Sequence, residues 1–301
     1  LIAKYQTFDS AKEWARTLPK WDGVPRIETF YRDYLGADDT AYARALGVYQ
    51  WTGMAGRLMD PGCQLDITPI WVGAQGCGKT TSVKALSPSP EYFGPIDLGL
   101  KDADFSRKVR GKLIGEIGEL RGMYGREREA VKDLMTRTHE EWSEKFVEHP
   151  TRYARRIFMV ATTNVDQILD DPTGNRRYAP IRVGKCDAQR IAEDRDQLWA
   201  EGLARYGEQG IAWQELTRLQ QEAQKEFEIV DTWAAPIEKW LREGGPHPHG
   251  VRVTDLLESA LYIMPKDQNR AAEMRVAAIL RSLGLSAKRT TIDGVKAMRW
   301  S

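Results

Sequence analysis

The sequence predicts an α/β fold in which a parallel sheet carries a glycine-rich loop, with helices before the sheet and a helix-and-hairpin module after it. Three observations support this prediction. Short apolar segments alternate with helical segments between residues 67 and 183, which is typical of a parallel α/β sheet. The first apolar segment leads directly into the glycine-rich loop. Outside this region the apolar residues recur mostly with helical spacing.

Four short apolar segments are predicted to be the strands of the sheet. They are Ile67–Val72, Lys112–Ile117, Arg156–Thr162 and Ala179–Val183. Apolar runs of this length, bounded by turn residues, are typical of buried strands. A polar helix is expected between the second and third strands, over Glu127–Thr138.

The first 62 residues are predicted to form an N-terminal helical bundle. Ser10 is a suitable N-cap for a first helix over Ala11–Arg16, and Glu13 completes a capping box. Helical spacing returns over Ile27–Leu35 and again over Ala41–Met59. A turn that contains two prolines separates the first helix from the second.

Further helices and a hairpin are predicted after the core, which we assign to residues 63–186. A charged helical extension is expected over residues 187–245. The last segment, 246–301, contains two helical stretches and then a strand-like pair around Asp293-Gly294, a dipeptide typical of tight hairpin turns. We therefore expect a small winged-helix-like module at the C-terminus.

The residues that carry chemistry begin with the glycine-rich loop. It fits G-x-x-x-x-G-K-T, the pattern of loops that bind nucleoside triphosphates. Glycines let backbone N–H groups approach the phosphates, while Lys79 supplies a mobile charge and Thr80 a hydroxyl suited to Mg²⁺. The alternative is a glycine-rich turn with an exposed lysine. The predicted nucleotide-binding residues are Gly73, Ala74, Gln75, Gly76, Cys77, Gly78, Lys79, Thr80 and Thr81.

Two glutamates follow the apolar start of the second predicted strand. Hydrolysis of a triphosphate needs an acidic partner for Mg²⁺ and a base for the attacking water. We assign Glu116 to the metal, directly or through water, and Glu119 to the water. The reverse assignment stays open, as does the alternative that both are surface residues.

An asparagine and two arginines complete the predicted catalytic set. Asn164 ends the third predicted strand, where its amide can bind the γ-phosphate or the attacking water. Its alternative role is to close the strand with an Asx turn. Arg176 and Arg177 carry guanidiniums suited to phosphate, and such a residue can act from a neighbouring subunit. The alternative is that they are surface residues without a role.

Composition and length exclude several classes of protein. The chain has 301 residues, of which 42% are hydrophobic and 29% charged, as in a folded globular protein. We expect no membrane span and no signal peptide, because no apolar run approaches ~18 residues. Three separated cysteines predict a reducing, cytoplasmic location. The first residue, Leu1, is not methionine, so we expect the chain to be part of a longer protein.

Together these motifs resemble the virulence-associated protein E family of phage and mobile-element replication proteins. That family belongs with the superfamily 3 helicases, which are related to the AAA+ ring ATPases. The resemblance extends over about residues 20 to 210 and is carried by Trp21–Arg26, Gln75–Thr80, Gly115–Leu120, Thr162–Asn164 and Gly174–Arg177.

The resemblance implies an AAA+-like P-loop NTPase core that moves along single-stranded DNA at the expense of ATP. It implies a homo-oligomeric ring, usually of six subunits, with ATP and Mg²⁺ bound between neighbours. It gives Asn164 the sensor position and makes Arg176 or Arg177 the finger that reaches the adjacent subunit. It also implies a primase domain or partner in front of the chain, and a location in the cytoplasm of a bacterial host.

The resemblance further implies a DNA-contacting hairpin over residues 142–152, in which Lys145, His149 or Arg152 would contact phosphate. A replicative helicase core is therefore the first hypothesis. A second is a regulatory ATPase that does not translocate and acts in a defence or packaging complex. A third is a small-molecule kinase, although the paired glutamates and Asn164 suit hydrolysis better.

Overall fold

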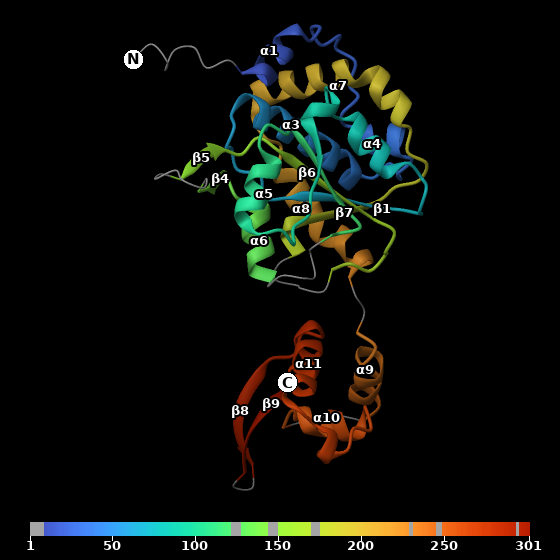
Figure 1. The fold of residues 1–301 in the computed structure, drawn as a ribbon. Coiled ribbons are helices and arrows are strands. Elements are labelled where there is room, and N and C mark those ends of the chain that lie inside the picture. The colour runs from blue at the N-terminus through green and yellow to red at the C-terminus, as the bar shows by residue number, and fades with distance from the viewer. Residues whose placement is uncertain are drawn as a thin grey trace. The chain divides into compact units, whose positions relative to one another are not determined.

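The chain divides into two compact units, Leu1–Glu228 and Ile229–Ser301. The structure is a computed structural model, and Figure 1 shows both units. The division lies inside the stretch 187–245, which we expected to form one helical extension, so that α9 (Ala234–Glu243) belongs to the second unit. The residues that the structure describes are 9–121, 128–143, 150–169, 175–228, 231–244, 249–292 and 295–301.

A five-stranded parallel sheet forms the centre of the first unit, with the strand order β2-β3-β6-β1-β7. The four predicted strands are confirmed to within two residues at each end. β2 was not predicted, because three residues that include Gly94 and Pro95 show no strand pattern. The strands are β1 (Thr68–Val72), β2 (Phe93–Pro95), β3 (Ile114–Gly118), β6 (Phe158–Thr163) and β7 (Tyr178–Arg182).

Helices cover both faces of this sheet (Figure 1), and a separate hydrophobic cluster fills each interface. The cluster on the second face includes residues of α5 (Asp102–Val109) and α6 (Arg128–Thr136). The helices in the cluster on the first face are α1 (Ser10–Thr17), α2 (Phe30–Leu35), α3 (Ala41–Met59), α4 (Lys79–Ala85), α7 (Ala188–Gln209) and α8 (Gln214–Gln224). In the described part of the chain, no helix is both long and apolar enough to cross a bilayer.

Helix α3 occupies the same residues that the sequence predicted, and it is buried around most of its circumference. Fourteen of its 19 residues are buried, among them Trp51 and Arg57. A Cβ added at Gly47 would lie 2.2 Å from the carbonyl oxygen of Ile27, so only glycine fits at this crossing of the chain. The helices of the expected N-terminal bundle therefore share one hydrophobic core with the sheet.

Two N-terminal helix starts differ from the prediction. The N-cap of α1 is Asp9 rather than Ser10, because the Asp9 carboxylate accepts a hydrogen bond from a backbone N–H of the first turn. Helix α2 begins at Phe30 instead of near Ile27. The backbone N–H of Ile27 donates to the side chain of Glu201 at 3.0 Å, and this contact holds the residues before Phe30 outside the helix.

The second unit has its own hydrophobic core. Two helices, α10 (Val253–Ser259) and α11 (Arg270–Ser282), are followed by the antiparallel strands β8 (Ala287–Ile292) and β9 (Val295–Trp300). This order of two helices and a hairpin confirms the predicted elements of the C-terminal segment. The expected turn at Asp293-Gly294 lies outside the described residues.

Candidate functional site

The glycine-rich loop connects the end of β1 to the start of α4, as the sequence predicted. Gly76 and Gly78 have φ angles of 80° and 98°, a conformation that residues with a Cβ rarely adopt. At Gly73 an added Cβ would lie 2.6 Å from the carbonyl oxygen of Val183. The shape of the loop therefore requires glycine at all three positions.

The ammonium group of Lys79 lies within this loop. Its Nζ donates to the carbonyl oxygens of Gly73 at 2.6 Å and Ala74 at 2.9 Å, and the residue is 7% exposed. Within the described residues, no carboxylate forms an ion pair with it. An ammonium group that is held by neutral carbonyl oxygens can leave them for an anionic acceptor, because a hydrogen bond to a charged acceptor is stronger.

One carboxylate oxygen joins the loop helix to two strands. Oε1 of Glu116, in β3, accepts a hydrogen bond from Thr80 in α4 at 2.6 Å and another from Thr162 in β6 at 2.8 Å. Glu116 is 5% exposed, so it needs these donors in place of water. We had not predicted Thr162 as a site residue, although it belongs to the Thr-Thr-Asn run that ends β6.

Glu119 and Asn164 lie at the same edge of the sheet and are exposed. The backbone N–H of Gly73 donates to the carbonyl oxygen of Thr163 at 3.1 Å, which places the start of the loop beside the end of β6. Because β3, β6 and β1 are adjacent and parallel, their carboxyl ends share this edge. The structure thus places the loop, both glutamates and Asn164 at one edge of the sheet.

The turn that carries Glu119 is strained. Glu119 and Leu120 have φ angles of 50° and 53°, a left-handed conformation that costs residues other than glycine about 1–3 kcal/mol each. Leu120 is buried and packs in the cluster on the second face of the sheet. This packing fixes the turn while Glu119 points to solvent.

Two cysteines meet at the base of the loop. The backbone N–H of Cys186 donates to the carbonyl oxygen of Cys77 at 2.9 Å. Sγ of Cys77 lies 3.8 Å from Nζ of Lys79. Burial raises the pKa of the Cys186 thiol to about 12. The segment after β7 therefore supports the loop through a backbone hydrogen bond, while the buried Cys186 thiol stays protonated.

Arg176 and Arg177 lie at the opposite edge of the sheet. They belong to η3 (Asn175–Arg177), directly before β7, and the first residue of β7 pairs with Thr68 at the start of β1. At a rise of about 3.3 Å per residue, this places them about 20 Å from Gly73. Neither arginine can reach the loop of its own chain. Both line an open groove of about 750 Å³.

Two buried glutamines of α8 hold η3 in place. Nε2 of Gln220 donates to the carbonyl oxygens of Arg176 at 3.0 Å and Tyr178 at 2.6 Å. Nε2 of Gln224 donates to those of Asn175 and Tyr178, each at 2.6 Å. The glutamines are 3% and 5% exposed. Sequence reasoning missed this role, because glutamine in a polar helix is usually solvated.

Comparison with known proteins decides the family. The model of the virulence-associated protein E-like domain matches residues 15–230. The chain belongs to this family. The match ends close to Glu228, where the first unit ends, so the family's domain corresponds to the unit that contains the sheet.

Solved structures with a similar fold include the apo structure of the NrS-1 C-terminal region and two A-form apo structures of the same region. Each has a TM-score of 0.52, and the sequence identities are 14%, 15% and 13%. The alignments cover 95% of this chain and 77% of those chains. At such identities the likeness shows the fold alone. A search of curated proteins finds no match.

Most of the hairpin that we expected over residues 142–152 of this virulence-associated protein E-like chain lies outside the described residues. Its two ends belong to β4 (His139–Trp142) and β5 (Thr151–Ala154), which pair antiparallel. Arg152 is exposed and lies directly opposite Glu141. Lys145 and His149 lie outside the described residues.

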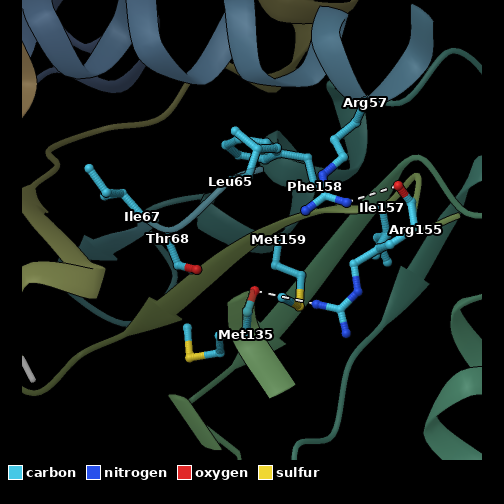
Figure 2. Close-up of a pocket in the computed structure, with 9 residues that line it drawn as sticks. All are labelled: Arg57, Leu65, Ile67, Thr68, Met135, Arg155, Ile157, Phe158 and Met159. Carbon is cyan, nitrogen blue, oxygen red and sulfur yellow. Dashed lines mark hydrogen bonds between the residues drawn. The ribbon is translucent and has the colours of Figure 1, made fainter. Parts of the chain in front are cut away.

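A buried ion pair anchors the base of this hairpin. Glu140 in β4 pairs with Arg155, which also donates to the carbonyl oxygens of Leu134 and Met135 at the end of α6. Arg57 of α3 donates to the carbonyl oxygen of Arg155 at 2.9 Å (Figure 2). The cavity beside these arginines measures about 10 Å³, the space of a single water molecule, so we assign it no ligand.

Proposed function

We propose that this chain is the ATP-hydrolysing, DNA-translocating core of a phage or mobile-element replication protein, and that it works as a ring with ATP bound between neighbouring copies. The observation that carries the proposal is the distribution of the predicted catalytic groups. The glycine-rich loop, Glu116 and Thr80 meet at one edge of the sheet, and the arginines lie at the other.

The residues of the loop fit a triphosphate and Mg²⁺. Its glycines leave the backbone open to phosphate oxygens. Among the described residues, Lys79 donates to two carbonyl oxygens and to the sulfur of Cys77, none of which is a carboxylate. Thr80 and Glu116 offer the hard oxygen ligands that Mg²⁺ prefers. The described residues contain no group of three or more His, Cys, Asp or Glu suited to a metal, so phosphate oxygens and water would complete the shell. Bound MgATP supplies a phosphoanhydride whose terminal bond is open to attack by water.

The other residues at this edge fit the handling of water. Glu119 is exposed on a rigid, strained turn, where its carboxylate can accept a proton from the attacking water. Asn164 can donate to the γ-phosphate or orient the water from the end of β6. Glu116 is buried and held by two hydroxyls, which favours the metal side for it and the water side for Glu119.

The position of Arg176 and Arg177 supports a shared site. A head-to-tail contact between copies presents the amino edge of one sheet to the carboxyl edge of the next, and repeated contacts of this kind close into a ring. An arginine supplied across such a contact stabilises charge on the transferred phosphoryl group. The groove that both arginines line is open, so a neighbour has access to them. The family resemblance supports six copies.

The DNA-contacting role of the β4–β5 hairpin rests on the family resemblance. Its buried anchor to α6 and the core, through Glu140 and Arg155, suits an element that transmits movement. One observation favours the second candidate, a regulatory ATPase without translocation. Glu141 stands opposite Arg152, so the described part of the hairpin has no excess of cations to bind phosphate.

One experiment separates these functions. The rate of ATP hydrolysis is measured with and without single-stranded DNA, together with the mass in solution in the presence of a non-hydrolysable analogue. We expect stimulation by DNA and a ring-sized mass. A flat rate with saturating DNA would reject translocation and leave the regulatory ATPase.

The variant Lys79→Ala tests the nucleotide site itself. We expect it to abolish turnover, because the β- and γ-phosphates lose their cation. Lys84→Ala is the matched control, since Lys84 is exposed on the same helix. Unchanged turnover in Lys79→Ala would reject hydrolysis at this loop.

A further inference from the structure

We propose that Cys77 and Cys186 form a reversible disulfide when the protein meets a peroxide, and that this bond lowers nucleotide turnover at the glycine-rich loop. We name the two residues the cysteine pair. The effect on turnover rests on the proposed function, whereas formation of the bond does not. The inference is carried by the contact between the two residues, by the charge beside Cys77 and by how firmly each side of the pair is held.

The two cysteines are close enough to be bonded. The backbone N–H of Cys186 donates directly to the carbonyl oxygen of Cys77 at 2.9 Å, which places their Cα atoms roughly 5–6 Å apart. A disulfide usually spans about 4.4–6.8 Å between Cα atoms. The side chains also converge, because the Cys186 thiol is in side-chain hydrogen-bond contact with that of Cys77. A bond between the two sulfurs therefore needs no rearrangement of the sheet.

The two thiols differ in exposure, and this difference assigns their roles. Cys77 is half-buried, whereas Cys186 is 8% exposed and packs in the cluster on the first face of the sheet. Burial, together with the neighbouring Cys77 thiol, raises the pKa of Cys186 to about 12. A peroxide reacts with a thiolate that it can reach, so Cys77 is oxidised first. Nζ of Lys79 lies 3.8 Å from Sγ of Cys77, where its charge attracts a reacting thiolate.

The reaction balances with one hydrogen peroxide and two thiols. The thiolate of Cys77 attacks one oxygen of the peroxide and the O–O bond breaks, so that Cys77 becomes a sulfenic acid and the other oxygen leaves as water after taking up a proton. The sulfur of Cys186 then attacks the sulfur of the sulfenic acid. The S–OH bond breaks, and the hydroxyl leaves as a second water with the proton of the Cys186 thiol. The two thiols lose two electrons, which reduce the peroxide.

The segment that carries Cys186 is held firmly on both sides of this residue. Before it, Val183 donates its backbone N–H to the carbonyl oxygen of Val72 in β1 at 2.8 Å. After it, Asp187 donates its backbone N–H to the carbonyl oxygen of Tyr34 in α2, also at 2.8 Å. Because a bond requires the sulfurs to approach closer than their present contact, one side has to move. The segment after β7 is not that side.

The loop is the side that moves. Cys77 stands between Gly76 and Gly78, which have positive φ angles, and glycine permits many backbone conformations. Bonding draws Cys77 toward Cys186 and displaces the loop amides from the positions in which they would surround a phosphate. A displacement of about 1 Å at a reactive site can lower a rate about 10²-fold. Oxidation should therefore lower turnover and leave the rest of the fold in place.

The test treats the reduced full chain with a small excess of hydrogen peroxide, alkylates the remaining thiols and identifies the peptides by mass spectrometry. We expect a linked Cys77–Cys186 peptide from within one chain. ATP hydrolysis, measured on the same samples, should fall at least about tenfold and return after treatment with dithiothreitol. Cys63→Ser is the matched control, because Cys63 precedes β1, and this variant should keep both the linked peptide and the loss of turnover.

Two further variants separate the bond from simple oxidation. Cys186→Ala should give no linked peptide, and its Cys77 should instead carry a sulfenic acid that dimedone traps. Cys77→Ser should give neither product. The proposal is overturned if the parent yields no Cys77–Cys186 peptide, if Cys63 or a second chain supplies the bond, or if the linked protein hydrolyses ATP as fast as the reduced one. A parent that forms the bond and hydrolyses no ATP in either state would reject the proposed function together with the control of turnover, and would confirm the disulfide alone.

Discussion

The hydroxyl of Thr162 donates to Oε1 of Glu116 over 2.8 Å, so the end of β6 is tied to the middle of β3. The same oxygen accepts a hydrogen bond from Thr80, one residue after the loop lysine. A displacement of Thr80 would therefore also move the end of β6, because both are hydrogen-bonded to the same carboxylate. Asn164 lies two residues beyond Thr162, which connects the loop to the proposed sensor.

Removing the Thr162 hydroxyl should weaken both the fold and the metal site. Thr162→Val keeps the shape of the side chain and takes one donor from a buried carboxylate, so the free energy of unfolding should fall by about 1–3 kcal/mol. We also expect more Mg²⁺ to be needed for half-maximal ATP hydrolysis. Urea unfolding and a Mg²⁺ titration measure the two effects. Thr291→Val, at an exposed strand position, should change stability by less than about 0.5 kcal/mol.

The two glutamates should differ in what their loss affects. Glu116→Gln should raise the Mg²⁺ requirement, since it removes the charge next to Thr80. Glu119→Gln should leave that requirement unchanged and lower kcat by roughly 10²–10⁴-fold, the usual contribution of a catalytic base. Steady-state kinetics at several Mg²⁺ concentrations distinguish the two. The opposite pattern would exchange the assignments.

Arginine variants should complement loop variants in mixtures. Arg177→Ala should bind nucleotide normally and lose turnover, because the backbone of residue 177 lies about 20 Å along the strands from Gly73 and its side chain would serve a neighbour. Mixing it with Lys79→Ala places an intact loop beside an intact arginine at some contacts, so part of the activity should return. Arg176→Ala is the parallel test. Activity that is strictly independent of mixing would argue against a shared site.

The two buried glutamines should matter for turnover more than for binding. Gln220→Met keeps the size of the side chain and removes both hydrogen bonds that hold η3, so kcat should fall while nucleotide affinity stays unchanged. Stability should decrease by about 1–3 kcal/mol. Gln221→Met, at the exposed neighbouring position, is the control. Equal losses of affinity and kcat would mean that Gln220 supports the fold without positioning the arginines.

Cysteine alkylation offers a test of nucleotide binding without hydrolysis. At pH 8 the Cys186 thiol, with its pKa raised to about 12 by burial, should be labelled slowly, because only about one molecule in ten thousand is a thiolate. Cys77, in the loop, should be labelled and then protected by MgATP. Cys63, which precedes β1 and is separated by that strand from the loop, should be labelled at the same rate with and without nucleotide. Mass spectrometry of peptides gives the three rates, and absent protection of Cys77 would contradict binding at the loop.

The local pattern of apolar residues in the sequence predicted four strands and α3. The residues that this pattern did not predict are explained by contacts between distant parts of the chain. Apolar runs identified β1, β3, β6 and β7 because these strands are buried on both faces. Helix α5 was missed, since its polar residues conceal a short apolar stripe over Phe105 and Val109. The loop, the glutamates and Asn164 follow strands β1, β3 and β6, whose carboxyl ends share an edge because the strands are adjacent and parallel. That these residues form one catalytic site stays a prediction.

The sequence could not show which residues support that site. The contact between Thr162 and Glu116 joins residues 46 positions apart, and the hydrogen bonds of Gln220 and Gln224 reach back more than 40 positions. Such contacts depend on the register of the sheet and the placement of α8. Glutamine carries no pattern that separates a buried amide from a solvated one.

The burial of α3 limits how this protein can be shortened. A fragment that starts at residue 63 would leave Trp71 and Phe158, which share a cluster with that helix, facing solvent on one side of the sheet. Such a fragment would expose a broad apolar surface and aggregate before its chemistry could be assayed. The smallest soluble piece with an intact loop should therefore retain Ile27, whose side chain is fully enclosed.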